Sequence, residues 1–79
     1  MARIIDGERK NLIGGILKKL RMKLKVSQQE LSNKLELLGI YVCRGSISRI
    51  EDYSRTVTDI ELFAIAQILG VDPKELYQK

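Results

Sequence analysis

The sequence predicts an all-α protein, a compact bundle of five short helices. Three observations indicate this class. Apolar residues recur at helical spacing along most of the chain, as in residues 13–24. Capping signals, each a Ser, Thr or Asp followed three residues later by Glu, mark helix starts at 27–30, 58–61 and 72–75. Residues 39–43 form the longest stretch with a strand-like pattern, which is too short for a sheet.

Length and composition limit what the chain can be. Its 79 residues make one domain, and 44% hydrophobic with 30% charged residues is typical of a soluble globular protein. A single Cys excludes an intrachain disulfide and is compatible with a reducing compartment. There is no apolar run near 18 residues and no signal-peptide pattern. We therefore expect a cytoplasmic protein that does not enter a membrane.

The first helix follows a short arm. Residues 1–9 are expected to form a partly flexible N-terminal arm, and residues 10–79 the folded domain. The helix is predicted over about 10–25, with five side chains in one inward stripe: Ile13, Ile16, Leu17, Leu20 and Leu24. Arg21 lies at the edge of this stripe, so its guanidinium is expected to need an anionic partner.

The second and third helices are joined by a connection that is unusually long. A capping box at 27–30 opens the second helix, predicted over about 28–38, with inward Leu31, Leu35 and Leu38. Gly39 is a natural left-handed stop. The connector then places Ile40 and Val42 towards the core and Tyr41 outward. The third helix begins at Cys43 or Arg44, with Ile47 and Ile50 facing inward.

The last two helices are predicted from strong start signals. The box at 58–61 opens a fourth helix that is apolar nearly all round, so it is expected to lie in the core: Leu62, Phe63, Ile65, Ala66, Ile68 and Leu69. Gly70 ends it. Asp72 and Pro73 then open a short fifth helix that contributes Leu76 to the core.

The third helix differs from the fourth because it has only a thin apolar edge. Its outer face carries Arg44, Gly45, Ser48 and Arg49, with Ser46 beside them. One helix fits the DNA major groove, where Arg can bind O6 and N7 of guanine and Gly permits close backbone approach. The charge distribution agrees, because residues 1–55 hold 12 basic and 6 acidic residues, a net charge of +6, whereas the remainder has a net charge of −2.

Three segments resemble one known family, the phage-repressor-like (Cro and lambda-repressor, or XRE) helix-turn-helix family. They read LKKLRMKLKVSQQELSNKL, CRGSISRIED and DIELFAIAQILGVDP, and the resemblance covers residues 12–77. It implies the five-helix lambda-repressor-like fold, with the DNA-reading motif at about 27–52. The family joins the two motif helices by a shorter turn, so the extended connection of this chain is a departure.

The resemblance also implies site residues and partners. With the outer face described above, it gives five base-contacting residues: Arg44, Gly45, Ser46, Ser48 and Arg49. Contacts to the DNA backbone are expected from seven more: Lys25, Gln28, Gln29, Tyr53, Ser54, Arg55 and Thr56. Arg21 and Glu51 match a structural ion pair of the family. The implied function is a transcriptional regulator, probably a repressor in type, that binds duplex DNA as a homodimer through its C-terminal helix.

Two other classes of function were weighed. In the first, the bundle is an antitoxin-like or adaptor module that binds a protein partner through residues 40–42 and the C-terminal helix. The second class, an enzyme, is not expected, because the chain has no His, no phosphate-binding loop and no cluster of carboxylates. Without His or a second Cys beside Cys43, neither a metal site nor a cofactor is expected.

Overall fold

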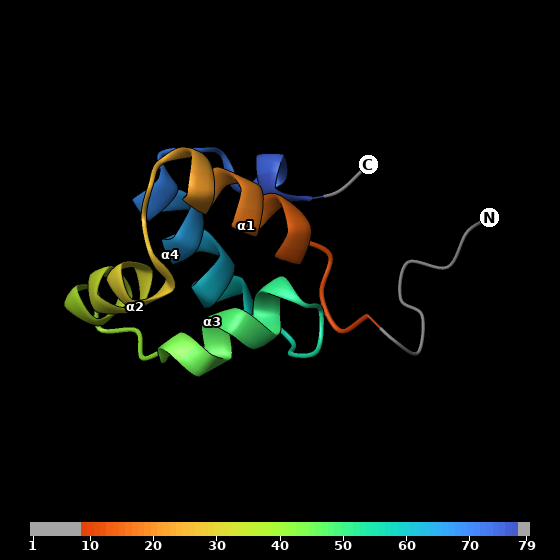
Figure 1. Ribbon diagram of the computed structural model, residues 1–79, viewed down its shortest axis with the longest axis horizontal. Helices are drawn as coiled ribbons and strands as arrows, with labels where there is room; N and C mark the ends of the chain where they lie inside the picture. The colour runs from red at the N-terminus through yellow and green to blue at the C-terminus, as the bar shows by residue number, and fades with distance from the viewer. Residues whose placement is uncertain (1–8, 78–79) are drawn as a thin grey trace.

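A computed structural model describes residues 9–77, and this part of the chain folds into four α-helices followed by one 3₁₀ turn (Figure 1). The elements are α1 (Gly14–Lys23), α2 (Gln28–Leu37), α3 (Arg44–Glu51), α4 (Asp59–Leu69) and η1 (Pro73–Leu76). The all-α prediction is confirmed, with the fifth helix reduced to the single turn η1. The predicted arm lies outside the described residues except for Arg9.

The helices enclose one small core. α4 packs against α2 and η1, α1 packs against α3 and η1, and α2 packs against α3. In Figure 1, α3 lies along the lower edge of the molecule, with α1 and α4 above it. Every element contributes to the core, which comprises Ile13, Leu17, Leu31, Leu35, Val42, Ile47, Ile50, Ala64, Ile65, Ala66, Leu69 and Leu76.

The predicted helix starts at the three capping boxes are confirmed. Ser27, Thr58 and Asp72 each accept a backbone N–H of the first turn, and the Glu three residues on accepts the N–H of the capping residue. These reciprocal bonds satisfy amide groups that a helix start otherwise leaves unpaired. The three chain segments therefore have sharply defined first turns.

The first helix is shorter than predicted at both ends. The side chain of Asn11 accepts the N–H groups of Ile13 and Gly14, so the helix begins after it, at Gly14 instead of residue 10. At the other end Lys25 takes a left-handed conformation with φ +59°, which stops the helix at Lys23. Leu24, predicted to face inward, is consequently exposed.

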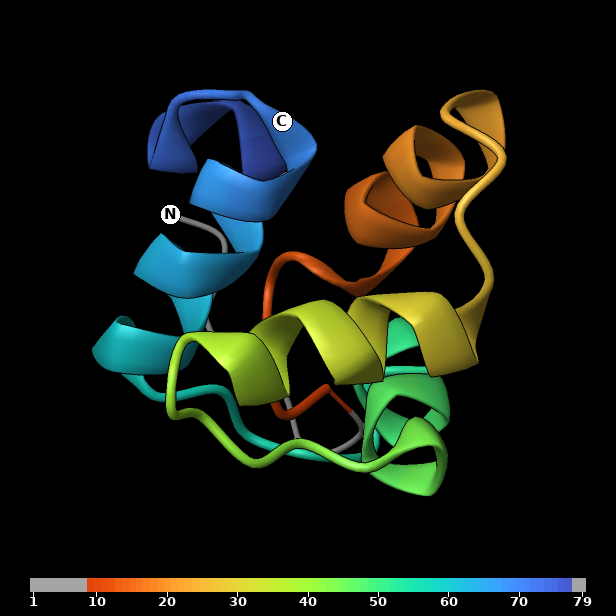
Figure 2. The ribbon, with the colours of Figure 1, turned by 90° about the vertical axis from the view of Figure 1, so that its left-hand side faces the viewer.

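The long connector between α2 and α3 has the predicted form. Gly39 adopts φ +81° after α2, a value that strains any side-chain-bearing residue. Val42 is buried and Tyr41 is exposed, while Ile40 packs against the edge of the core. Figure 2 shows this yellow-green segment passing below α2 to the start of α3. Two buried anchors thus set where α3 begins.

Two further core predictions are wrong. Leu38 and Phe63 were expected to face inward, and both are exposed. Leu38 lies beyond the last turn of α2, where the chain turns away at Gly39. Phe63 lies on a side of α4 that no other described helix covers, because α2 and η1 pack against other sides. The apolar surface of α4 is therefore wider than the surface that the core uses.

Candidate nucleic-acid interface

Helix α3 presents one buried edge and one open face. Ile47 and Ile50 are fully buried, whereas Arg44, Gly45, Ser48 and Arg49 are exposed and Ser46 is half-buried. The capping residue, Cys43, is extended and makes no side-chain hydrogen bond to the first turn. The first N–H groups of α3 are therefore open, and the helix start offers partial positive charge beside two guanidinium groups.

Neither exposed arginine of α3 is paired with a carboxylate in residues 9–77. Nothing there hydrogen-bonds to the Arg44 side chain, and Arg49 Nη2 donates only to Ser46 Oγ, at 3.1 Å. The Cys43 thiol also lies 3.4 Å from Ser46 Oγ, and this hydrogen bond lowers the pKa of the thiol. Ser46 thus orients Arg49, and both cations remain available to an external anion.

A buried ion pair fixes the other end of α3. Arg21 Nε lies 2.7 Å from Glu51 Oε2, and Arg21 Nη2 lies 3.1 Å from Glu51 Oε1. Arg21 Nη1 also donates to the carbonyl oxygen of Val26, and Gln28 Nε2 donates to Glu51 Oε1 at 3.0 Å. This network joins α1, the start of α2 and the last turn of α3. Gln28 was expected to contact the head of α3, but its amide is bound at the tail.

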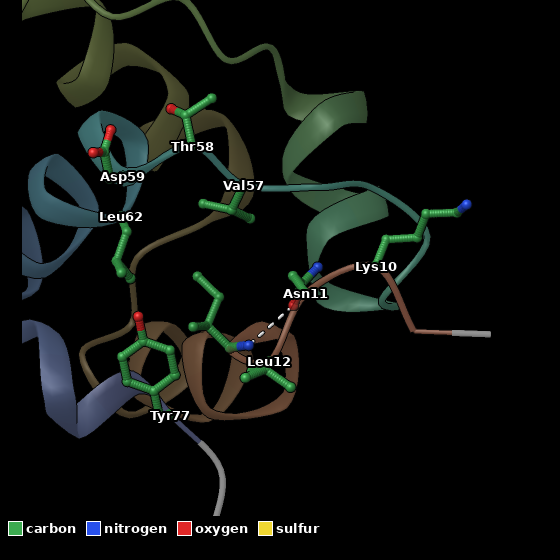
Figure 3. A pocket seen from close by; sticks show the side chains of 9 residues that line it. Lys10, Asn11, Leu12, Val57, Thr58, Asp59, Leu62 and Tyr77 are labelled. Atoms are coloured by element: carbon green, nitrogen blue, oxygen red, sulfur yellow. Dashed lines mark hydrogen bonds between the residues drawn. The ribbon is translucent and has the colours of Figure 1, made fainter. Parts of the chain in front are cut away.

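Asn11 is a positioning residue that the sequence analysis missed. Its Nδ2 donates to the carbonyl oxygens of Ile50 (3.0 Å) and Arg55 (2.8 Å), while its Oδ1 caps α1. Figure 3 shows this side chain turned towards the start of α1. One amide thereby ties α1 to the end of α3 and to the following loop. An Asn placed before an apolar periodic segment was the available signal.

The loop after α3 is held by Tyr53. This residue adopts φ +69°, a conformation that usually requires Gly. Its hydroxyl accepts the N–H of Gly15 at 2.9 Å, and the Arg9 guanidinium lies 4.3 Å from its ring centroid. Both contacts offset the backbone strain. The Asp52 carboxylate accepts the N–H of Ser54, so it is bound within the loop.

Arg55 has an intramolecular partner that the sequence did not reveal. Its guanidinium forms two 3.0 Å hydrogen bonds with the Glu61 carboxylate at the start of α4. The Arg55 hydrogen bonds lower the pKa of Glu61 and raise that of Arg55. Arg55 therefore positions the loop against α4, and less of its charge is available for a phosphate than that of Arg44.

The residues expected to contact the DNA backbone fall into two groups. Gln28, Tyr53 and Arg55 are half-buried and engaged inside the protein, as described above. The other four are exposed: Lys25, Gln29, Ser54 and Thr56. Of these, Gln29 donates to Asn33 and Ser54 to the carbonyl oxygen of Arg49. The exposed group lies at the start of α2 and in the loop after α3, on either side of the motif.

The described chain offers little to a small ligand. A hollow of about 210 Å³ lies between the segment before α1, the start of α4 and Tyr77 (Figure 3), below the size usual for ligand pockets. Residues 9–77 contain no group of three potential metal ligands. In the same range, none of the helices has the length and apolar character needed to cross a bilayer.

Comparisons with known proteins agree with this geometry. A family model described as helix-turn-helix matches residues 17–76. The crystal structure of the restriction-modification controller protein C.AhdI from Aeromonas hydrophila matches with a TM-score of 0.69 and 28% identity, over 82% of this chain and 91% of that chain. The DNA-binding domain of BldD gives a TM-score of 0.73 at 22% identity, over 94% of this chain and 100% of that chain.

No curated protein sequence matches the chain significantly. The helix-turn-helix match, however, spans most of the chain, and the solved structures share the arrangement of its helices. The open face of α3 occupies the second helix of that motif, the helix that enters DNA in such domains. The chain belongs to the XRE-type helix-turn-helix family of DNA-binding transcription regulators.

Proposed function

We propose that this protein is a sequence-specific transcriptional repressor that reads the DNA major groove with the open face of α3. The observation that carries the proposal is the state of Arg44 and Arg49. Both are exposed on one helix face, and no carboxylate of residues 9–77 neutralises either of them. Arg side chains so presented suit bidentate binding to guanine, and occupation of the site would exclude other proteins from it.

Gly45 gives independent support, because the fold itself does not require a glycine there. A Cβ at Gly14 would lie 2.3 Å from a backbone oxygen, and Gly39 and Gly70 have positive φ. At Gly45 the nearest atom to such a Cβ is the flexible end of Arg49, at 3.7 Å. Gly in a helix nevertheless costs about 1 kcal/mol relative to Ala. Close approach of the α3 backbone to DNA accounts for a glycine at this position.

The surroundings of α3 supply the remaining contacts in this proposal. Lys25, Gln29, Ser54 and Thr56 are exposed on either side of α3 and would contact phosphates. The start of α2 would add the positive end of a helix dipole. Since phosphate contacts release counterions, we expect DNA affinity to fall steeply with salt. A homodimer on a palindrome would place its half-sites about 10 bp apart.

Replacing either arginine of α3 is expected to weaken specific binding. Arg44→Ala and Arg49→Ala should each cost about 1–3 kcal/mol of binding free energy and relax the preference at one base pair. The measurement is selection of bound sites from random duplexes, followed by titration of the selected site at several salt concentrations. Lys18→Ala is the matched control, because Lys18 is an exposed cation on α1, outside the motif.

The proposal fails if both arginine variants select the same sites with the affinity of the native protein. It also fails if the native protein shows no salt-dependent binding to any duplex. The other candidate function, an adaptor module that docks through residues 40–42, has weaker support. In that segment Val42 is buried and Ile40 packs on the core, so Tyr41 alone offers an exposed side chain.

A further inference from the structure

One apolar surface of this small protein is not used by its core. Along α4, Ile60, Phe63 and Gln67 lie on one face, with Ile60 65% and Phe63 63% exposed. At the end of α2, Leu37 is 86% and Leu38 48% exposed. A shallow groove joins the two helices and is lined by Lys34, Leu37, Leu38, Gln67 and Ile68. We call this continuous surface, with Ile60 and Phe63, the α2–α4 patch.

The size of the α2–α4 patch matches what a stable dimer needs. A fully exposed large apolar side chain presents on the order of 150–200 Å². The exposed fractions of Leu37, Leu38, Ile60 and Phe63 therefore leave about 400–500 Å² of apolar surface in solvent. A stable interface buries about 800 Å² per partner, and about 65% of a homodimer interface is apolar, which is roughly 500 Å².

The charges at the edges of the patch are self-complementary. Exposed Lys34 lies at the α2 edge, and exposed Asp59 lies at the α4 edge, one turn before Phe63. In a two-fold interface each residue meets the opposite edge of the same patch on its partner. A two-fold axis near Phe63 therefore brings the Lys34 ammonium of one copy towards the Asp59 carboxylate of the other, twice per dimer.

We propose that the occupant of the α2–α4 patch is a second copy of this chain, in an isologous dimer. This inference rests on the proposed function in one respect, since a palindromic DNA site calls for two copies. None of the base-contacting residues of α3 lines the patch, so both reading helices remain open in the dimer. The C-terminal turn, expected earlier as the dimer surface, is a poorer candidate because Leu76 is fully buried in the core.

Sedimentation equilibrium of the full chain without DNA tests the interface, from low to high micromolar concentration. The native protein should dimerise reversibly, and Phe63→Glu should weaken self-association at least tenfold. Met22→Glu is the matched control, because Met22 is a similarly exposed apolar residue on α1, outside the patch. Circular dichroism shows whether each variant is folded. Since Phe63 is exposed, Phe63→Glu should keep its helical spectrum.

A charge-reversal pair tests the two-fold geometry itself. Lys34→Glu and Asp59→Lys should each weaken the dimer, and the double variant should recover most of the native association. A native protein that stays monomeric at every concentration, or a Phe63→Glu variant that dimerises like the native one, would overturn the inference. So would a patch that binds only a different protein. Binding of a single half-site by Phe63→Glu separates this failure from failure of the proposed DNA contact.

Discussion

Glu51→Gln is expected to lower the free energy of unfolding by about 3–5 kcal/mol. The native carboxylate accepts two hydrogen bonds from Arg21 and one from Gln28, and only 4% of its side chain is exposed. The variant would keep the shape of the side chain but leave the Arg21 guanidinium, 11% exposed, without its counter-charge. A buried charge without a partner is more costly than the pair itself. Urea denaturation followed by circular dichroism measures the loss.

The second ion pair of the protein provides the matched control. Arg55 and Glu61 also form a bidentate pair, but 26% and 13% of their side chains are exposed. Glu61→Gln should therefore cost only about 1 kcal/mol, because water can solvate the remaining guanidinium. Replacing both Arg21 and Glu51 by Leu should recover much of the stability lost in Glu51→Gln. Equal losses in Glu51→Gln and Glu61→Gln would contradict the role assigned to the buried pair.

Gly14→Ala is expected to destabilise the fold by about 3 kcal/mol, the upper end for overpacking. The added Cβ would lie 2.3 Å from the carbonyl oxygen of Ile50 and 3.0 Å from that of Glu51. Both are backbone atoms at the end of α3, so no side-chain rotation can relieve the contact. Either α1 or α3 must move, which would also strain the Asn11 hydrogen bonds between them. The change in urea midpoint, at unchanged slope, measures this cost.

Gly45→Ala is the control for this substitution. It makes the same chemical change in another helix, where the nearest heavy atom would be 3.7 Å away. There the gain in helix propensity, up to about 1 kcal/mol, should dominate. If Gly14→Ala were as stable as Gly45→Ala, the close approach of α1 to α3 would not be a feature of the folded protein in solution.

The local features of the fold were predictable from the sequence. Capping boxes and the Gly39 stop depend on residues within four positions of each other, so their pattern is visible in the chain. The exposure of α3 followed from its thin apolar edge. The start of α1 was predicted three to four residues too early, because Asn11 is bound to groups 39 and 44 residues away. Such long-range hydrogen bonds leave no periodic signal.

The remaining errors also have tertiary causes. Periodicity reports that Phe63 and Leu38 are apolar, but not that the neighbouring helices are too few to cover them. Arg55 was expected at the DNA backbone, because its pairing with Glu61 depends on how the loop folds onto α4. Arg21 was correctly expected to need an anion, since a guanidinium at the edge of an apolar stripe is part-buried in any packing. Position on a helix is thus predictable, whereas the identity of contacts between segments is not.

The central claim is that the open face of α3 is shaped for DNA and not for the fold. Gly45→Ala tests it most directly, with unfolding and DNA titration measured on the same preparation. The claim predicts a protein that is at least as stable as the native one but binds its selected duplex at least tenfold more weakly, because the new methyl group meets the groove. A Gly45→Ala protein that binds this duplex with native affinity would contradict it.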